Sequence, residues 1–464
     1  MKLQHKIVIV LMTILVFVVG FLSYNGLNGM GFHKLLKKHE TGTVYLWYTN
    51  GLMSDYYNNV ASIYNKNNKD VDVVPKLVSA SEYLENIYRA SIEGEDFPDL
   101  YVITNDLMEK AYLSGLTMPV ADTATLEEAF PEVAIDAASY DSILLGYPIY
   151  FDTSTLVYNK TMLEQIAYDQ FVITAEAEGV ENPESIEVPK EDIANLVNMM
   201  IPETVDELIQ LSNNIEAPEG LETVFKWNIN DVFFNYFYLG EYTSLSADNI
   251  DIYNDNTAAC MEIFKRVTEY FYMDAETVTT ENVLSEFMQG KVLFTILDCE
   301  SAVKLEQANA EGLLNFTYDY ALIPDPGRVI VQDEEGNNIV VSGDTILQGR
   351  PLSTTTILVV NGYADQPQAA ADFAEFMTME HYFTDQLYDK TGYIPAHKQA
   401  VTSSNMEVIF KQEYEASVPM PNSMVTSNFW MLLENAFNEI WDGADAKDTL
   451  ESLEARLKNQ IPGK

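Results

Sequence analysis

The chain has 464 residues, enough for two or three domains of ordinary size. Its 71 acidic and 26 basic residues give a net charge of −45, which excludes nucleic acid and anionic lipid as binding surfaces. Hydrophobic residues are 47% and charged residues 21%, as in an ordered globular protein.

The N-terminal segment, residues 1–24, is predicted to be a signal peptide or a membrane anchor. Lys2 and Lys6 precede an unbroken apolar run over residues 7–22. Neither an Ala-x-Ala cleavage site nor a cysteine for lipid attachment follows, which favours an uncleaved anchor over a cleaved signal. Residues 25–42 then form a predicted tether. In both cases we expect the rest of the chain to lie at the extracellular face of the cytoplasmic membrane.

Strands and helices alternate from Thr43 onward. Residues 43–51 predict a strand that ends in a turn, and a helix follows with apolar residues on one face. Residues 71–75 predict a second strand, residues 81–94 a helix, and residues 97–104 a third strand. This alternation is typical of a parallel sheet covered by helices, the α/β class.

The middle of the chain changes in character. Residues 164–203 are acidic and interrupted by proline, so we expect an inserted loop with short helices. Helical patterns dominate residues 204–290, and residues 290–298 predict another strand. Residues 318–327 predict a strand that breaks into a Pro-rich turn, and residues 328–341 a hairpin.

The C-terminal part returns to a strand followed by helices. Residues 354–360 predict a strand, and Pro367 opens a helix. Residues 391–398 break this helical pattern, and the chain after them is predicted to be helical to its end.

The aromatic and charged residues favour an uncharged ligand that carries hydroxyl groups. The chain has 28 Tyr, 22 Phe and 4 Trp but few Arg, the residue best suited to carboxylate and phosphate. Sugar rings stack on aromatic faces, and their hydroxyls bond well to carboxylates. An anionic or phosphorylated substrate is therefore not expected.

Six blocks in chain order share a further pattern: residues 43–51, 95–106, 146–160, 287–301, 391–398 and 420–443. They include a Pro-Asp before a strand, a Tyr-Pro-Ile run that ends in Tyr-Asn-Lys, and a Phe-x-x-Gly-Lys strand. Together these blocks resemble the extracellular solute-binding proteins of ABC importers, of the maltodextrin-binding type.

The resemblance implies a two-lobed, periplasmic-binding-protein-like fold of type II whose hinge is made of crossover strands. The crossovers are expected near residues 151–153, 320–325 and 396–405. The expected boundaries give lobe 1 residues 43–151 and 321–398, and lobe 2 residues 152–320 and 399–464. The implied function is capture of a neutral sugar or oligosaccharide by a monomer without cofactor or metal, and its delivery to ABC permease subunits.

Some ligand-binding candidates follow from their surroundings in the sequence. Asp152 lies in an aromatic run beside Tyr150, so we expect it to accept hydroxyl hydrogen bonds at the mouth of a cleft. A surface acid beside core aromatics is the alternative. Trp47 and Tyr48 end the first strand, where α/β clefts bind ligands, and core packing explains them equally well. Trp430 lies at the edge of a helix's apolar stripe, where an indole can be half presented to a sugar or can pack only against protein.

The resemblance supplies further candidates. The family's acid after the third strand corresponds to Asp106, with Asn105 beside it, and capping of a helix is the alternative for Asp106. Trp227 corresponds to an aromatic residue before the helices of the second lobe, where a structural role and a ligand-binding role are equally expected. Glu222 matches a family contact loosely. A sugar-stacking Trp of the family corresponds to Trp430.

Two departures from the family concern specificity. Glu300 stands where the family has an aromatic residue, so the chain offers Asp298 and Glu300 there. Glu434 replaces a family Arg on a C-terminal helix. Both indicate a ligand that differs from the family's own, whose identity, length and linkage the sequence does not specify.

The sequence leaves other classes of protein open. A surface adhesin that binds polysaccharide without transport is one alternative, and a glycoside-active enzyme with paired carboxylates is a weaker one. We expect no enzyme, because the sequence lacks a Ser-His-Asp order, a Gly-rich phosphate loop and His residues at metal-binding spacing. Residues 251–256 could hold calcium but lack EF-hand spacing. Cys260 and Cys299 are predicted to be buried thiols, with one disulfide as the alternative.

Overall fold

The computed structural model describes residues 41–459 except 95, 246–248, 272, 276, 333–337, 341–345 and 422–427. The predicted signal or anchor and most of the predicted tether therefore lie outside the described residues. Among the residues that are described, no helix is both long enough and apolar enough to cross a membrane.

Lobe 1 is built on a mixed sheet with the strand order β16-β6-β15-β3-β1-β2. Its strands are β1 (Gly42–Tyr48), β2 (Val71–Leu77), β3 (Leu100–Thr104), β6 (Tyr147–Asp152), β15 (Leu352–Val360) and β16 (Ile394–Pro395). β1 is parallel to β2 and to β3, whereas β15 is antiparallel to both β3 and β6. A short strand, β17 (Val418–Pro419), pairs with the start of β15.

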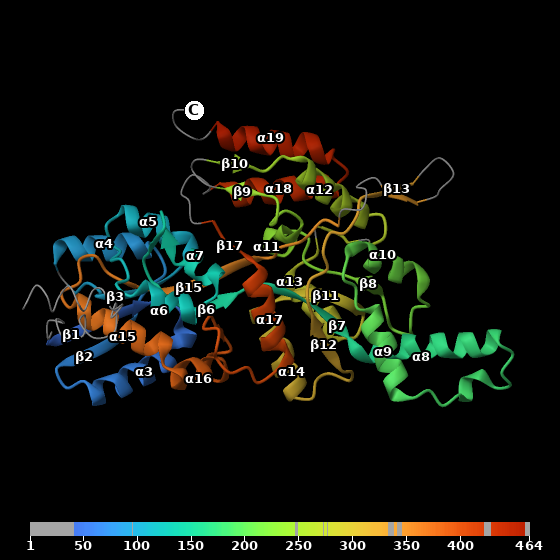
Figure 1. Ribbon diagram of the computed structural model, residues 1–464, viewed down its shortest axis with the longest axis horizontal. Helices are drawn as coiled ribbons and strands as arrows, with labels where there is room; N and C mark the ends of the chain where they lie inside the picture. The colour runs from blue at the N-terminus through green and yellow to red at the C-terminus, as the bar shows by residue number, and fades with distance from the viewer. Residues whose placement is uncertain are drawn as a thin grey trace, which may run out of the picture.

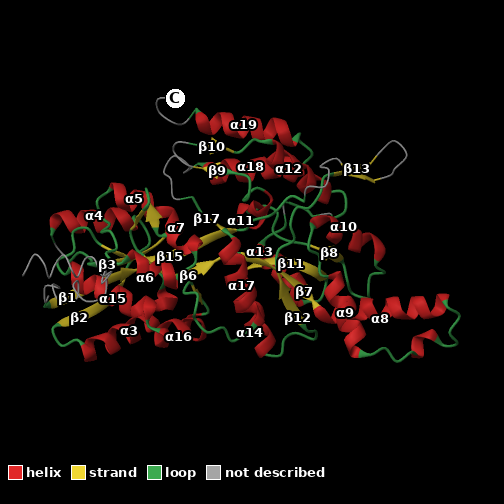
Figure 2. Cartoon of the chain, viewed as in Figure 1, coloured by secondary structure: helices red, strands yellow, loops and turns green. Residues whose placement is uncertain are grey.

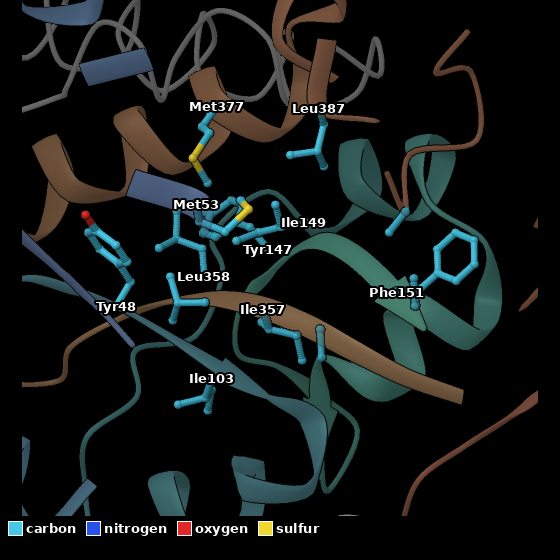
Figure 3. Close-up of a cluster of buried hydrophobic side chains, with 14 of the residues drawn as sticks. Tyr48, Met53, Ile103, Tyr147, Ile149, Phe151, Ile357, Leu358, Met377 and Leu387 are labelled. Carbon is cyan, nitrogen blue, oxygen red and sulfur yellow. The ribbon is translucent and has the colours of Figure 1, made fainter. Parts of the chain in front are cut away.

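Helices cover this sheet (Figures 1 and 2). They are α3 (Ser54–Asn67), α4 (Tyr83–Glu93), α5 (Met108–Leu113), α6 (Thr123–Ala129), α7 (Glu132–Ala137), α15 (Pro367–Met379) and α16 (His381–Thr391). α3 buries Tyr56, Val60 and Tyr64 on its predicted apolar face. Figure 3 shows side chains from β3, β6, β15 and the two C-terminal helices of this lobe meeting in one hydrophobic core.

Lobe 2 is built on a second sheet with the order β12-β7-β11-β8. Its strands are β7 (Ser154–Asn159), β8 (Thr223–Phe225), β11 (Val292–Asp298) and β12 (Tyr318–Ala321). Its principal helices are α10 (Val205–Asn214), α11 (Val232–Asn235), α12 (Asp255–Val267), α13 (Thr280–Met288), α14 (Cys299–Ala310), α18 (Phe429–Trp441) and α19 (Ala446–Lys458). Two α/β lobes, each a sheet wrapped by helices, confirm the predicted fold class.

The acidic segment 164–203 is more helical than predicted. α8 runs without a break from Lys160 to Ala177, and α9 (Lys190–Met200) packs against it. Glu favours helices, and packing against a neighbouring helix adds stability that the polar composition hides. The strand β8 was missed within the region predicted to be helical, whereas β13 (Ile330–Gln332) and β14 (Asn338–Val340) confirm the predicted hairpin.

The chain passes between the lobes at three places. The first is Thr153, between β6 and β7. The second is later than residues 320–325, because Val205 N donates to Asp325 O (2.9 Å) and Arg350 N donates to Phe237 O (3.1 Å), so the chain stays on lobe 2 until β15 begins. The third is later than residues 396–405, because β17 still pairs with β15.

One helix, α17 (Asn405–Ala416), bridges the two lobes at the centre of the molecule (Figure 1). It contacts β7 and β12 of lobe 2 and α7 of lobe 1. The ring of Tyr414 stacks on Phe151 with centroids 3.9 Å apart, and the buried carboxylate of Glu413 accepts a hydrogen bond from Ile323 N. The hinge is therefore lined by packed and hydrogen-bonded side chains.

Candidate functional site

The strand ends of lobe 1 place several candidates at one edge of its sheet. β3 and β6 run in the same direction, because each is antiparallel to β15. β1 is parallel to β3, so all three strands end at the same edge, with Tyr48, Thr104 and Asp152 as their last residues. The carboxyl edge of an α/β sheet is where such folds bind ligands.

The same point receives strand ends from lobe 2. β7 continues from β6 after Thr153, and its first residue, Ser154, lies opposite Asp298, the last residue of β11. β8 is parallel to β11, so it also ends at this edge. The carboxyl edges of both sheets thus meet where the chain crosses from one lobe to the other, and we call this region the interlobe edge.

Carboxylates gather at the interlobe edge. Asp152 Oδ1 accepts a hydrogen bond from Cys299 N (3.0 Å), and Asp298 caps α14 by accepting from Ser301 N (2.8 Å). Burial first, and then the negative charges of Asp298 and Glu300, raise the pKa of Asp152 above the usual range of an Asp. Burial also raises the pKa of Asp231, and the charge of Asp298 adds to this shift. The edge is therefore rich in hydrogen-bond acceptors.

Glu300 has a cationic partner, but an exposed one. Lys304, one helical turn along α14, lies 2.8 Å from Glu300, and about half or more of each side chain is exposed to solvent. This ion pair contributes little to stability, because both groups are solvated. Lys304 pairs with Glu300 only, and neither Asp152 nor Asp298 forms a salt bridge among the described residues.

Two stacked tyrosines lie beside Asp152 on the lobe 1 side. Tyr150 and Tyr393 have ring centroids 4.3 Å apart and planes inclined by 17°. Asn50 follows β1, and its Nδ2 donates to the hydroxyl of Tyr393 (2.7 Å) and, at longer range, to that of Tyr150 (3.5 Å). Asn50 Oδ1 accepts from Leu52 N (3.0 Å), which fixes the orientation of the amide.

Gly392 explains why Tyr393 lies at the interlobe edge. Its φ of +79° lets the chain turn out of α16 into β16, a conformation that other residues rarely adopt. A Cβ at this position would lie 3.2 Å from the side chain of Val303 on α14 of lobe 2. The turn therefore packs against lobe 2 and delivers Tyr393 to the boundary between the lobes.

Trp430 lies on lobe 2, in the first turn of α18. Its ring is half-buried and makes edge contacts with Tyr236 and Phe429, at centroid distances of 5.7 and 4.9 Å. α11, which contacts α18, β11 and β15, is capped by Asp231. These contacts place Trp430 on the same side of lobe 2 as the acids, with part of its indole exposed.

Trp47, Tyr48 and Asn105 are occupied by contacts within lobe 1. Trp47 and Tyr48 are 8% and 3% exposed, and Tyr48 is part of the core in Figure 3. The Asn105 side chain is buried, donates to Met420 O (2.6 Å) and accepts from Thr355 N (2.9 Å). Asp106 is exposed near the interlobe edge and accepts a hydrogen bond from Thr104, so it remains accessible to a ligand.

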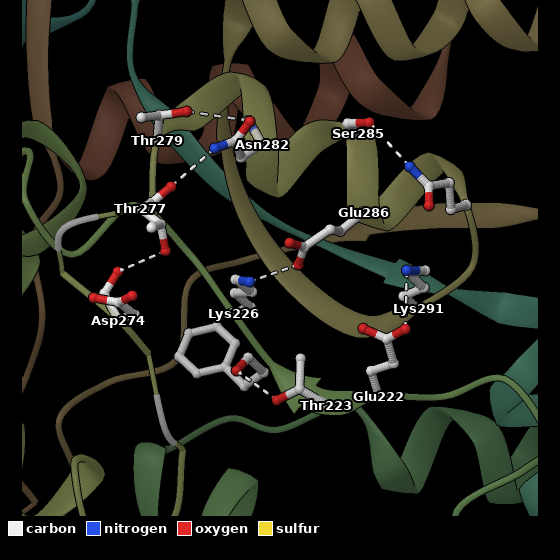
Figure 4. A network of polar contacts seen from close by, with 12 residues as sticks. Glu222, Thr223, Lys226, Asp274, Thr277, Thr279, Asn282, Ser285, Glu286 and Lys291 are labelled. Atoms are coloured by element: carbon white, nitrogen blue, oxygen red, sulfur yellow. Dashed lines mark hydrogen bonds and ion pairs between the residues drawn. The ribbon is translucent and has the colours of Figure 1, made fainter.

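Trp227 and Glu222 are occupied by contacts within lobe 2. Trp227 is fully buried, stacks on Phe225 at 4.5 Å and donates to Asn235 Oδ1 (2.8 Å), so both its ring and its polar atom are used by the core. Glu222 precedes β8 and pairs with Lys291 (2.9 Å), at the opposite end of the sheet from Asp298, as Figure 4 shows for the pair.

A hollow opens beside the acids. It has a volume of about 350 Å³ and lies between α13 and α14, with Asp298 and Glu300 in its wall. This volume falls within the usual range of ligand pockets. A second hollow of about 380 Å³ lies between α4 and α5 of lobe 1, and none of the acids just described lines it.

Three residues of the interlobe edge were not predicted from the sequence. Asn50 was recognised only as part of a turn, and Tyr393 only as part of a helix-breaking block. Asp231 could have been recognised as a helix cap before the apolar run of α11, because Asp followed by a helical pattern is a capping signal.

Comparison with known proteins was made at two levels. The family described as "Bacterial extracellular solute-binding protein" matches residues 59–416, more than three quarters of the chain. At the level of structure, the fold resembles an extracellular solute-binding protein from Staphylococcus aureus in complex with maltose. The TM-score is 0.71 at 16% identity, and the alignment covers 91% of this chain and 99% of that one.

Two further structures share the fold over a similar length. A cyclo/maltodextrin-binding protein complexed with maltotetraose matches with a TM-score of 0.68 at 17% identity, over 92% of this chain and 99% of that one. A maltose-binding periplasmic protein from Listeria monocytogenes, in complex with maltose, matches with a TM-score of 0.65 at 18% identity, over 91% and 98%. At these identities the likeness establishes the fold.

Proposed function

Since the chain belongs to the bacterial extracellular solute-binding proteins, we propose that it captures a neutral sugar or oligosaccharide outside the cell and delivers it to the permease of an ABC importer. Two of the solved structures that share its fold are complexes with maltose and with maltotetraose. We assign it no catalytic step, because binding and release are sufficient for this role.

The observation that carries the proposal is the pairing of aromatic rings with carboxylates at the interlobe edge. Tyr150, Tyr393 and Trp430 offer ring surface, while Asp152 and Asp298 offer acceptors for hydroxyl groups. An anionic ligand would meet the negative charges of Asp152, Asp298 and Glu300 here, and Lys304, which pairs with Glu300, is exposed to solvent. A neutral polyol suits this arrangement best.

We infer that ligand binding closes the two lobes. The chain crosses between them at three places, and rotation about these crossings would leave the hydrogen-bonded sheet of each lobe intact. α17 contacts both lobes and would move with the hinge. Closure would bring Trp430 of lobe 2 toward the tyrosines of lobe 1.

For the cellular setting, we propose that the protein works at the extracellular face of the cytoplasmic membrane. The apolar run at residues 7–22 supports export, and a retained anchor is favoured because neither an Ala-x-Ala cleavage site nor a cysteine for lipid attachment follows it. The tether would then hold the lobes near the permease. Fractionation of cells that express the full chain, followed by N-terminal sequencing of the mature protein, distinguishes an anchor from a cleaved signal.

A thermal-shift screen tests the proposed function. Glucose, maltose, cellobiose, maltotriose, a uronic acid and an amino sugar would each be added to the purified protein. A ligand that binds only the folded state stabilises it by about 2.7 kcal/mol at a hundredfold excess over Kd. We expect at least one neutral sugar to raise the melting temperature and the uronic acid to have no effect. A response to the charged compounds alone would contradict the proposal.

A further inference from the structure

The stacked pair Tyr150 and Tyr393 is held by a hydrogen bond from Asn50 to the hydroxyl of Tyr393. Tyr393 receives a hydrogen bond on its hydroxyl oxygen from Asn50 Nδ2 at 2.7 Å. Asn50 is held in place by Leu52 N, so the direction of its amide is set by the start of the following 3-10 helix. The hydroxyl oxygen of Tyr393 is thus an acceptor already in use, and its own hydrogen points to no acceptor among the described residues.

The position of this hydrogen relative to Asp152 follows from the strands. Tyr150 and Asp152 are two residues apart on β6, so their side chains lie on the same face, about 6.6 Å apart along the strand. Tyr393 stacks on Tyr150, and the next residues along β16 pair with β6. The Tyr393 ring is therefore stacked on a tyrosine that shares one face of β6 with the carboxylate acceptor Asp152.

We propose that Tyr393, stacked on Tyr150 and oriented by Asn50, is a ligand-binding residue that donates a hydrogen bond to an oxygen of the sugar while Asp152 accepts one from a neighbouring hydroxyl. This inference rests on the proposed function and specifies how lobe 1 holds one ring of the ligand. A ligand for this subsite must present an acceptor and a donor on nearby atoms, which is the chemistry of an uncharged polyhydroxylated ring. Asn50 is a positioning residue.

Charge at the subsite sets its selectivity. A carboxylate on the ligand could accept from Tyr393 but would face Asp152 and Asp298 at close range, so uronic acids are rejected. A sugar that lacks the hydroxyl facing Asp152 would leave that carboxylate without its ligand hydrogen bond and bind more weakly. The subsite thus selects for hydroxyl groups rather than for charge.

Two substitutions at one position test the inference in the full protein. Tyr393→Phe keeps the ring and removes the hydroxyl, whereas Tyr393→Ala removes both. Tyr363→Phe is the matched control, because Tyr363 is exposed and follows the far end of β15, at the opposite edge of the same sheet. Dissociation constants would be measured by calorimetry with whichever of glucose, maltose, cellobiose and maltotriose binds the wild type most tightly.

We expect Tyr393→Phe to weaken binding about two- to tenfold, the range of one neutral hydrogen bond, and Tyr393→Ala to weaken it further. Tyr363→Phe should bind as the wild type does, and the melting temperature of ligand-free Tyr393→Phe should stay near that of the wild type. Wild-type affinity in Tyr393→Ala would overturn this subsite alone. Failure of the wild type to bind any of these sugars would overturn the proposed function, and the subsite with it.

Discussion

Replacement of Asp152 separates the charge of this residue from its shape. Asp152→Asn removes the negative charge but keeps an oxygen that can accept a hydrogen bond from Cys299 N. The first backbone N–H of α14 therefore keeps its acceptor. Asp152→Ala removes both the charge and the acceptor. Because burial and the neighbouring acids raise the pKa of Asp152, ionised Asp152 destabilises the empty protein, and Asp152→Asn should melt at a higher temperature than the wild type at pH 8.

The same substitutions should weaken sugar binding in a graded way. A hydrogen bond to a charged group contributes about 1.5–3 kcal/mol and a neutral one about 0.5–1.5 kcal/mol. Asp152→Asn should therefore cost about 1–1.5 kcal/mol, or roughly five- to tenfold in affinity, and Asp152→Ala about tenfold to more than a hundredfold. Asp152→Asn should thus lower the sugar affinity while it raises the melting temperature. A substitution that only destabilised the fold would lower both.

Calorimetric titration across pH provides the assay. Protonation removes the charged acceptor, so wild-type affinity should fall as pH is lowered through the raised pKa of Asp152, and Asp152→Asn should show a flatter profile. Glu222→Gln is the control, because Glu222 pairs with Lys291 at the opposite end of the lobe 2 sheet. If Asp152→Ala bound the sugar as tightly as the wild type, the placement of the site at the interlobe edge would be refuted.

Three further predictions concern Trp430, Trp227 and Glu413. Trp430→Ala should lower the free energy of sugar binding by about 1–3 kcal/mol, by analogy with base stacking on aromatic side chains, and Trp430→Phe should recover part of this loss. An unchanged affinity of Trp430→Ala in a calorimetric titration would exclude a stacking role. Trp227→Ala should lower the free energy of unfolding by about 3–5 kcal/mol in urea, because the indole is fully buried, and a wild-type midpoint would contradict that burial. Burial raises the pKa of Glu413 to about 8, so the folded state keeps a proton that the unfolded chain loses near pH 4.5. Stability should therefore fall between about pH 5 and 8, by at most about 1.4 kcal/mol per pH unit, and Glu413→Gln should show a shallower fall in urea titrations; parallel profiles would argue against a buried, protonated Glu413.

Much of the fold could be predicted from local patterns. The strands that became β1, β3, β11 and β15 carry apolar residues on both faces, and the helices between them carry one apolar face. Such periodicity is set by burial and needs no knowledge of distant contacts. The full length of α8 was not predicted, because the acidic composition of this segment indicates a loop. The helical preference of Glu and the packing of α9 against α8 stabilise the helix instead.

The hinge crossings were less predictable, because long-range backbone hydrogen bonds decide them. Asp325 stays on lobe 2 through its carbonyl bond to Val205, which lies 120 residues earlier in the chain. β17 joins lobe 1 through two residues that pair with the start of β15. Neither contact leaves a periodic signal in the sequence.

In the candidate site, too, residues were predicted where their neighbours in the sequence indicate a role and missed where a distant contact defines it. Asp152 and Tyr150 were identified from an unusual acid in an aromatic run, and the structure places both at the interlobe edge. Trp430 was favoured as a stacking residue from its position at the edge of an apolar stripe, whereas the sequence left structural and ligand-binding roles equally open for Trp227; the structure buries Trp227 fully and leaves Trp430 half-exposed. Tyr393 was missed, since its stacking partner lies 243 residues away.

Small-angle X-ray scattering with and without a saturating neutral sugar tests the central claim most directly. If the sugar is held at the interlobe edge, binding should draw the lobes together and reduce the radius of gyration, while the mass stays that of one chain plus ligand. The sugar chosen would be the one with the largest effect in the thermal screen, and Asp152→Ala at the same sugar concentration would serve as the weakened control. A radius of gyration that does not change at saturation would contradict capture between the two lobes.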